Sequence, residues 1–195
     1  MKPADVLQLL PMRRGHFRFE SGHHGETWID LELLCVRPGP VELLADELAA
    51  RLGPHRAEIV CGPLIEGAFV ALMVASRLGV PFTYSERIAG TGGLFPVRYR
   101  LPRPLRPLVE GRRVAIVNDV VNAGSAARGT YLDLQDCHAR PTVLATLATF
   151  GEGADRFTTE RGLALETLAS IPNQIWTPAD CPLCERNVPL QDPTA

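Results

Sequence analysis

Residues 114–126 read Val-Ala-Ile-Val-Asn-Asp-Val-Val-Asn-Ala-Gly-Ser-Ala, and this stretch decides the fold class. Its four leading apolar residues are rich in β-branched side chains, which predicts a strand over 112–118 that is buried on both faces. The pair Asn118-Asp119 ends that strand, and small and polar residues lead into a helix expected over 125–137. A buried strand, a short loop and a helix in this order are typical of a βαβ unit.

The same alternation of apolar strands and helices continues on both sides of this stretch. Helices are expected over 40–52 and 66–78, and strands over 58–61, 81–85, 141–150 and 163–171. This alternation predicts an α/β fold with a mainly parallel central sheet flanked by helices.

The chain is expected to form a single domain over 1–195, with three parts. Residues 1–35 form a small N-terminal piece with a helix over 4–10 and strands over 15–19 and 27–31, joined by a turn-rich link over 21–25. An α/β core spans 55–172 and a tail spans 173–195. Between positions 87 and 110 the chain is rich in glycine, proline and arginine, which predicts a mobile excursion next to the sheet with an edge strand over 97–101.

Composition narrows the class of function. The net charge of −2 and the pI of about 6.2 argue against a nucleic-acid protein held by bulk positive charge. No apolar run is long enough to predict a membrane span, and the first residues lack the pattern of a secretory signal, so a cytoplasmic location is expected. Lys2 is the only lysine, so any lysine role in mid-chain must be filled by arginine or left empty.

The loop after Asp119 has the chemistry of a phosphate cradle. Backbone N–H groups at the start of the expected helix, together with the Ser125 hydroxyl, can bind a phosphate, and the Asp119 carboxylate is within reach of sugar hydroxyls or a metal ion. An ordinary strand–turn–helix junction with a serine N-cap has the same pattern. The residues alone leave both interpretations open.

The cysteines and histidines suggest little chemistry by themselves. Cys181-Pro182-Leu183-Cys184 has metal-ligand spacing, but one pair supplies only two of the usual four zinc ligands, so a zinc site would need residues from elsewhere or from a second subunit. Two ordinary thiols near a C-terminal turn are the expectation. His16, His23 and His24 are expected to be exposed turn histidines, with substrate contact as the alternative.

Residues 114–126 resemble the phosphoribosyl-pyrophosphate (PRPP) motif of the type I phosphoribosyltransferases. Further segments resemble, in the same order, parts of the orotate phosphoribosyltransferases: their N-terminal signature, pyrophosphate loop, start of the flexible catalytic loop and, in some bacterial and archaeal members, C-terminus. These segments are Arg14-Gly15-His16-Phe17 with Ser21-Gly22, Cys61-Gly62-Pro63-Leu64-Ile65-Glu66-Gly67, Tyr84-Ser85-Glu86-Arg87 with Gly92-Gly93, and Trp176 with Cys181-Pro182-Leu183-Cys184 and Pro189. Because the ordered matches span nearly the whole chain, the resemblance is specific.

The resemblance implies the type I phosphoribosyltransferase fold and its chemistry. PRPP, carried with Mg²⁺, loses pyrophosphate at C1 of the ribose, and a base nitrogen takes its place; with orotate the product is orotidine 5′-monophosphate, for pyrimidine synthesis. The transition state has oxocarbenium character, so catalysis depends on placement and charge. The family also implies a homodimer in which the flexible loop of one subunit reaches towards the other's site.

The resemblance assigns roles position by position. It places the 5-phosphate on Asn122, Ala123, Gly124, Ser125 and Ala126, and the pyrophosphate on Gly62, Pro63, Leu64, Glu66 and Gly67. It places the ribose hydroxyls on Asn118 and Asp119, with Asp119 meeting the metal only through PRPP, and the leaving pyrophosphate on Arg87 and either Arg98 or Arg100. Asp119, Arg87 and Arg98 are thus the catalytic candidates, and Ser21, Gly22 and Phe150 are candidates for contact with the base.

The chain departs from the family pattern at these same positions. Asn118 replaces the first acid of the motif, Asn122 replaces the usual threonine, and Glu66 stands where many relatives have glycine or lysine. Thr149-Phe150 stands where an Asp-Arg pair reads the orotate carboxylate, and the catalytic-loop lysine is absent, although a shifted loop could bring Arg156 to the base. These departures leave two alternatives to orotate transfer: a transferase for a different base, and a PRPP- or nucleotide-binding regulatory paralogue with weak or no turnover.

Overall fold

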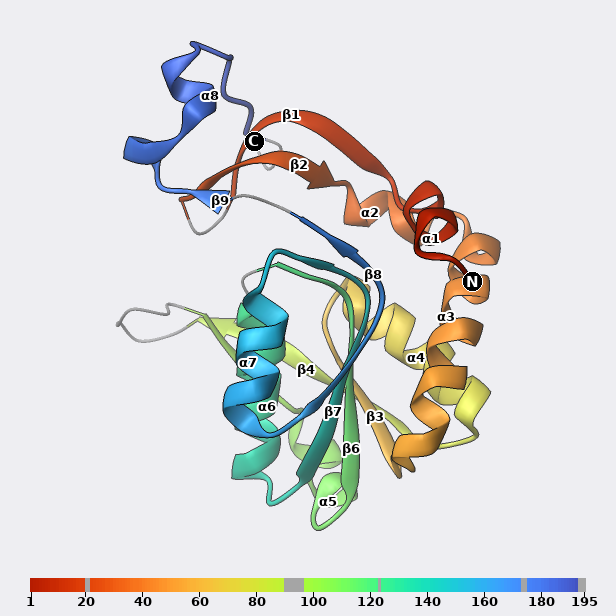
Figure 1. Ribbon diagram of the computed structural model, residues 1–195. Helices are drawn as coiled ribbons and strands as arrows, with labels where there is room; N and C mark the ends of the chain where they lie inside the picture. The colour runs from red at the N-terminus through yellow and green to blue at the C-terminus, as the bar shows by residue number, and fades with distance from the viewer. Residues whose placement is uncertain (20–21, 90–96, 123, 173–174, 193–195) are drawn as a thin grey trace.

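The computed structural model describes residues 1–19, 22–89, 97–122, 124–172 and 175–192 (Figure 1). The helices are α1 (Pro3–Leu9), α2 (Leu31–Leu34), α3 (Pro38–Leu52), α4 (Glu66–Leu78), α5 (Arg106–Val109), α6 (Ser125–Asp136), α7 (Gly153–Arg161) and α8 (Pro182–Glu185). The strands are β1 (Met12–Arg18), β2 (His24–Ile29), β3 (Ile59–Pro63), β4 (Phe82–Ala89), β5 (Val97–Arg100), β6 (Arg113–Val121), β7 (Arg140–Phe150), β8 (Ala164–Ile171) and β9 (Ile175–Trp176). Short 3-10 turns follow α3 and precede α5 and α8.

The central sheet confirms the predicted α/β class. Within the described residues it has six strands in the order β5-β4-β3-β6-β7-β8. All neighbouring pairs run parallel except β4 and β5, which run antiparallel. The edge strand expected over 97–101 is therefore present as β5, paired along β4.

Two hydrophobic clusters cover the two faces of this sheet. The α4-side core contains Val70 and Val74 of α4 with residues of α3, and the α6-side core contains Leu134 of α6 with residues of α5 and α7. Alternate residues of β6 enter opposite clusters: Ala115 and Val117 on the α4 side, Val114 and Ile116 on the α6 side. This two-sided burial is the reason for the uninterrupted apolar run that the sequence shows there.

The two ends of the chain share a second sheet. Strands β1, β2 and β9 form a three-stranded antiparallel sheet, and the C-terminal helix α8 lies beside it (Figure 1). In Figure 1 this sheet lies on the side of the molecule towards which the parallel central strands run. The N-terminal piece and the tail are thus one unit of structure, although the whole core separates them in sequence.

Several element boundaries differ from the sequence expectation for identifiable reasons. Strand β6 does not end at Asn118 but continues to Val121, because Val120 and Val121 still pair with β7. Strand β2 begins at His24, inside the expected turn. Helix α7 was not expected, because few of its residues are apolar, yet Phe157 anchors it in the α6-side core.

The structure tests two sequence predictions only in part: the mobile excursion after Arg87 and the lack of a membrane span. Most of the mobile excursion expected after Arg87, residues 90–96, lies outside the described residues. No helix in the described part of the chain combines the length and apolar character needed to cross a bilayer.

Candidate active site

The order of strands identifies where a ligand would bind. The chain passes outward from β3 to β4 in one direction and from β6 to β7 and β8 in the other, so the sheet changes winding direction between β3 and β6. The helices that follow these two strands, α4 and α6, lie on opposite faces. In open α/β sheets, ligands bind at the carboxyl ends of the strands at such a switch point. Both motifs singled out in the sequence, 61–67 and 114–126, lie there.

The phosphate-cradle geometry begins at Gly124. Gly124 is the N-cap of α6 and has a φ of 80°, a left-handed conformation that side chains strain to adopt, so glycine suits this position. Ser125 is the first helical residue, which places the N–H groups of the first turn and its own hydroxyl at one end of α6. Ala123 lies outside the described residues.

The side chain of Asn122, two residues before Gly124, has a polar atom without a hydrogen-bond partner among the described residues. Its Oδ1 is buried and has no hydrogen-bond partner within the described part of the chain. A side-chain amide can present either its oxygen or its NH₂ group by rotation, so this position can accept from a hydroxyl or donate to a phosphate. A buried orphan atom at the end of β6 fits a site that is completed by a polar ligand.

The loop after β3 is packed so closely that its glycines cannot be replaced without movement. A Cβ on Gly62 would lie 2.6 Å from Ala71 Cβ and 2.8 Å from the Gly67 carbonyl oxygen. The peptide bond between Leu64 and Ile65 is cis. The Leu64 N–H donates to the Ser85 carbonyl oxygen at 2.9 Å, which ties the loop to β4. Glu66 begins α4, and its side chain lies outside the described residues.

Asn118 and Gly67 bring the two motifs into contact. The Asn118 Nδ2 group donates to the Val120 carbonyl oxygen at 2.8 Å, so its Oδ1 points elsewhere. That oxygen lies so close to Gly67 that a Cβ there would be 2.2 Å from it. The position where the family has an acid therefore carries a neutral amide against the backbone at the start of α4.

Asp119 supplies the negative charge at this point. It is 4% exposed, and its Oδ1 accepts the Val120 N–H at 2.6 Å. Its own carbonyl oxygen accepts the Thr146 hydroxyl at 2.8 Å, which holds the strand end against β7. The backbone is thus fixed on both sides of a nearly buried carboxylate.

The structure separates the arginine candidates. In the β4–β5 pairing Arg87 lies opposite Tyr99, and Arg98 lies opposite Ile88, so Arg87 and Arg98 belong to opposite faces of this ribbon. The ring of Tyr99 packs against Gly129 of α6, so Arg87 is on the α6 face, the face on which the cradle lies. Arg87 and Arg98 are both exposed.

The candidates for base contact are more scattered. Gly22 is exposed in a left-handed turn with a φ of 78°, and Ser21 lies outside the described residues. Phe150 is 5% exposed and packs in the α4-side core. Arg156 is exposed on α7.

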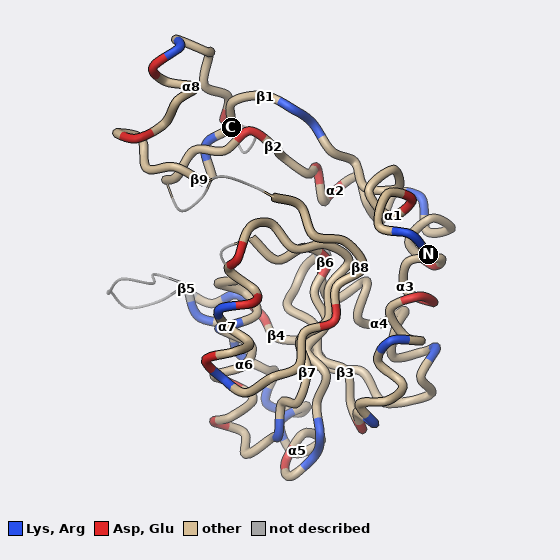
Figure 2. The backbone as a smooth tube through the Cα atoms, viewed as in Figure 1, with Lys and Arg blue, Asp and Glu red and all other residues tan. Residues whose placement is uncertain are grey.

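The arginines of the small sheet are held in ion pairs. Arg13 pairs with Asp30, Arg14 with Glu26 and Arg18 with Asp192. Figure 2 shows basic residues along β1 and acidic residues in and just after the neighbouring β2. Binding a substrate carboxylate through one of these arginines would require it to leave its present partner.

The two cysteines of the α6-side core among the described residues, Cys61 and Cys137, are poor nucleophiles. Cys61 is fully buried in β3, and burial raises the pKa of its thiol far above the ordinary value. The pKa of the Cys137 thiol is also raised, chiefly by burial and then by the charge of Asp133. Both thiols therefore stay protonated, and only a thiolate would be reactive.

The histidine expectation is wrong for two of the three residues. His16 is 1% exposed and His24 is 5% exposed, and both lie beside Cys181 and Cys184. The pKa of His24 is below its ordinary value, because burial disfavours the charged ring and the neighbouring positive charges add to this. Sequence spacing could not have joined two pairs of residues from opposite ends of the chain, and the Cys181–Cys184 spacing was the only signal.

Comparison with known proteins agrees with this geometry. No family model matches the chain. It is 30% identical over 182 residues to the orotate phosphoribosyltransferase of Pelotomaculum thermopropionicum, covering 93% of this chain and 90% of that one. It is 26% identical over 197 residues to the orotate phosphoribosyltransferase of Caldanaerobacter subterraneus, covering 99% and 97%.

Solved structures show the same fold. The orotate phosphoribosyltransferase of Aeropyrum pernix superposes with a TM-score of 0.68 at 24% identity, covering 88% of this chain and 94% of that one. The adenine phosphoribosyltransferase of Thermoanaerobacter pseudethanolicus superposes with a TM-score of 0.69 at 15% identity, covering 86% and 99%.

A parallel sheet with PRPP and pyrophosphate motifs meeting at its switch point defines a type I phosphoribosyltransferase fold. Within that class, the identity and coverage shared with the curated relatives show that this chain belongs to the orotate phosphoribosyltransferase family.

Proposed function

We propose that this chain transfers the phosphoribosyl group of PRPP to orotate, forming orotidine 5′-monophosphate and pyrophosphate in pyrimidine nucleotide synthesis. One observation carries the proposal: the start of α4 and the carboxyl-terminal part of β6 touch through Gly67 and Asn118 at the switch point of the sheet. The segments 61–67 and 114–126, joined by this contact, can bind the two phosphate-bearing ends of one PRPP molecule. The named relatives supply the identity of the base.

The roles of the residues follow from their chemistry. The first turn of α6, with Ser125 and Gly124, binds the 5-phosphate through N–H groups and the positive end of the helix. The backbone of 62–67 binds the pyrophosphate, since Gly62 and Gly67 leave no side chain in the way. Asp119 contacts the ribose hydroxyls and stabilises the positive charge that develops on the sugar.

Mg²⁺ fits this donor set as an ion that arrives with PRPP. The single nearly buried carboxylate of Asp119 is too small a set to bind a divalent ion alone, whereas Mg²⁺ is commonly held by one or two carboxylates together with substrate phosphates. When bound, the ion neutralises charge on the pyrophosphate. Asp119 would contact it through PRPP, and Asn118, being neutral, would not add charge.

Positive charge over the leaving pyrophosphate comes from arginine in this proposal. Only Lys2 is a lysine, so no lysine is present in the loop region. Arg87 is the better placed of the two candidates, because it shares the α6 face with the cradle. Arg98 on the opposite face would have to reach round the edge strand, or act at the site of a second subunit.

A homodimer is part of the proposal. Arginines on an edge ribbon can serve a neighbouring subunit's site as readily as their own, and the β4–β5 ribbon is such an edge. Light scattering on the purified chain should report twice the mass of 21.3 kDa. A stable monomer with full transferase activity would refute the homodimer and show that one chain forms the whole site.

A second candidate is transfer to an uncharged base. It is favoured by the ion pairs that engage Arg13, Arg14 and Arg18, and by the lack of an arginine at position 150, where the resemblance implies the one for the orotate carboxylate; Phe150 itself packs in the α4-side core. These features would lower the affinity for orotate relative to a base without a carboxylate.

The test is a pyrophosphate-release assay with PRPP, Mg²⁺ and a panel of orotate, uracil, adenine and hypoxanthine. Orotate should give the highest kcat/KM, and Asp119→Asn should lower it by about 100-fold, since a charge that stabilises the transition state is lost. Asp136→Asn, an exposed acid at the far end of α6, is the matched control and should leave the rate unchanged. Turnover with an uncharged base alone would support the second candidate, and PRPP binding without turnover of any base would support the regulatory alternative.

A further inference from the structure

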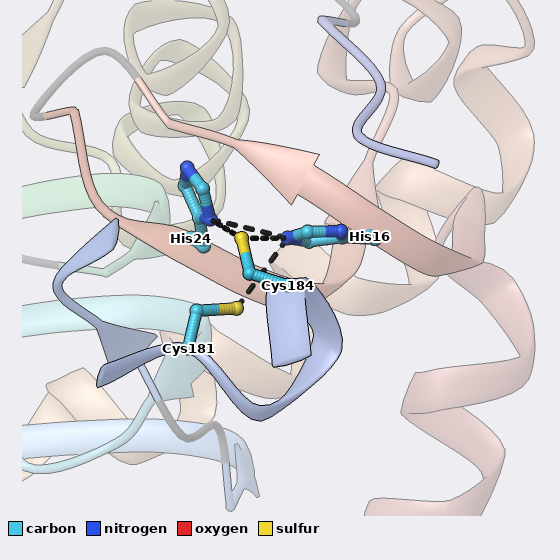
Figure 3. Close-up of side chains that lie close together, drawn as sticks. All are labelled: His16, His24, Cys181 and Cys184. Carbon is cyan, nitrogen blue, oxygen red and sulfur yellow. Dashed lines mark hydrogen bonds between the residues drawn. The ribbon is translucent and has the colours of Figure 1, made fainter. Parts of the chain in front are cut away.

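Four side chains from opposite ends of the chain converge on one point in the small sheet. His16 comes from β1, His24 from β2, and Cys181 and Cys184 from the start and the end of the first turn of α8 (Figure 3). Their ligand atoms all lie within 4.8 Å of one another. The cluster lies outside the PRPP and pyrophosphate motifs, and the transfer chemistry makes no use of it.

Four of the six distances between these atoms are close to those of a tetrahedral coordination shell. His16 Nε2 lies 3.1 Å from His24 Nδ1, and the nitrogen–sulfur distances are 3.3 Å for His24–Cys184, 3.4 Å for His16–Cys181 and 3.9 Å for His16–Cys184. In a zinc tetrahedron with ordinary bond lengths, two nitrogens are about 3.4 Å apart and a nitrogen and a sulfur about 3.6 Å. The other two distances, His24–Cys181 and Cys181–Cys184, are no longer than 4.8 Å, so a central ion can be accommodated with shifts of up to about 1 Å.

His16 is oriented for this role by a second contact. Its Nδ1 lies 2.8 Å from the Val188 carbonyl oxygen, an acceptor, so Nδ1 carries the proton and the Nε2 lone pair faces the cluster. Metal-bound histidines are commonly held in this way, with the remote N–H donated to a carbonyl. His16 also lies where the β1–β2 register shifts, between Arg14 and Phe17, and such irregularities re-aim a side chain.

The tail adds little hydrophobic core to the small sheet, and its last residues are held to β1 by the Arg18–Asp192 ion pair and by backbone hydrogen bonds of Gln191 with His16 and Arg18. Cys181 is fully buried and Leu183 is 8% exposed, but neither belongs to the two hydrophobic clusters found among the described residues. Strand β9 pairs with β2 at only two positions, His24–Trp176 and Gly25–Ile175. Small units with so little core are commonly stabilised by a metal or a disulfide.

We propose that His16 Nε2, His24 Nδ1, Cys181 Sγ and Cys184 Sγ bind one Zn²⁺ ion in a structural site that fastens the C-terminal tail to the N-terminal sheet. Two thiolates and two imidazoles in a tetrahedron are a donor set that zinc prefers. All four positions are filled by protein, so the ion has no open position for substrate and serves structure alone. Each thiol loses its proton to solvent on binding, and no redox change is involved.

The proposal is tested first by the metal content of the full-length chain. Protein purified without chelators should contain one zinc per chain by elemental analysis. After removal of the metal, titration with Zn²⁺ alone should restore one equivalent and protect two thiols from a thiol reagent. A chain that binds no Zn²⁺, or whose Cys181 and Cys184 form a disulfide under these conditions, overturns the proposal.

Matched cysteine variants assign the ligands. Cys184→Ser removes an exposed ligand without opening a cavity and should abolish stoichiometric zinc binding, whereas Cys35→Ser, on a cysteine outside the cluster, should retain one zinc per chain. Equal zinc content in the two variants would refute the assignment.

Spectroscopy of the unmodified protein keeps the test valid if a variant fails to fold. Zinc-edge absorption should give two sulfurs at about 2.3 Å and two nitrogens at about 2.0–2.1 Å. Co²⁺ added to the metal-free chain should give the intense visible bands of a tetrahedral thiolate complex. A zinc ion with only nitrogen and oxygen neighbours would show binding elsewhere and contradict the site. None of these readouts depends on transferase activity, so a failure here leaves the proposed function untouched.

Discussion

Gly67→Ala tests whether the two motifs are packed as the structure has them. An alanine Cβ would lie 2.2 Å from Asn118 Oδ1 and 3.2 Å from Pro63 Cγ, and the first distance is far below any normal contact. Asn118 cannot move away freely, because it is 7% exposed and its Nδ2 is bonded to the Val120 carbonyl oxygen at 2.8 Å. Relief of the clash therefore requires loss of that hydrogen bond or movement of the start of α4.

The sign of the effect follows from two opposing terms. Alanine is a better helix former than glycine, which would stabilise the start of α4 by about 0.5–1 kcal/mol. Overpacking a tight site costs about 1–3 kcal/mol, and losing the Asn118 hydrogen bond adds about 1 kcal/mol. We expect the free energy of unfolding to fall by about 1–3 kcal/mol.

Urea unfolding measures this change, and two further variants make it specific. Gly39→Ala in the first turn of α3 has open space around its Cβ and should be neutral or stabilising by up to about 1 kcal/mol. In the Asn118→Ala background, Gly67→Ala should lose most of its cost, because the clashing oxygen is gone. An unchanged free energy of unfolding for Gly67→Ala, or the same loss in both backgrounds, would refute the contact between the two motifs.

Three further predictions concern single positions. Gly124→Val should lower PRPP affinity measured by calorimetry, because the φ of 80° at Gly124 and the phosphate cradle both exclude a side chain. The control is Gly162→Val, at a φ of 65° away from the site. It should lower the free energy of unfolding by a similar amount, about 1–2 kcal/mol, and leave PRPP affinity unchanged. Asn118→Asp should raise kcat/KM or its dependence on Mg²⁺, because it restores the family's acid. Thermal unfolding should show that the free energy of unfolding falls by about 1–3 kcal/mol, because the hydrogen bond that Asn118 donates is lost. No change in rate or PRPP affinity would count against a ribose role for Asn118. Asp133→Ala should lower the free energy of unfolding measured in urea by about 2 kcal/mol. The Asp133 carboxylate is 6% exposed, pairs with Arg106 at 2.8 Å and accepts the Leu101 N–H at 2.6 Å. A decrease of less than about 0.5 kcal/mol would contradict that account.

The sequence was sufficient for features that depend on near neighbours. The helix expected over 66–78 has the bounds observed for α4, because its apolar spacing and the glycine after it act locally. The start of α6 at Ser125 follows equally from the small residues before it. The parallel sheet could be expected because apolar strands separated by helices leave few other arrangements.

The end of strand β6 and the presence of helix α7 could not be predicted from the local sequence. Strand β6 runs past Asn118 because β7 lies beside it, and pairing partners are a property of the folded sheet. Helix α7 carries a weak apolar pattern, and only the position of Phe157 against Tyr131, with ring centres 5.6 Å apart, shows why it forms.

The features of the candidate site also divide into those carried by near neighbours in sequence and those that join distant residues. Residues 114–126 and 61–67 are short contiguous segments, so their resemblance to the family's PRPP and pyrophosphate motifs could be recognised in the sequence, although the residues of 114–126 alone left a phosphate cradle and an ordinary strand–turn–helix junction both open. The contact of Asn118 with Gly67, the opposite faces of Arg87 and Arg98, and the burial of His16 beside Cys181 join residues that are distant in sequence. Such contacts depend on how strands are ordered and how the chain ends meet. Local pattern carries no information about either, because the hydrophobic burial that brings these segments together is non-directional and is satisfied only by the whole fold.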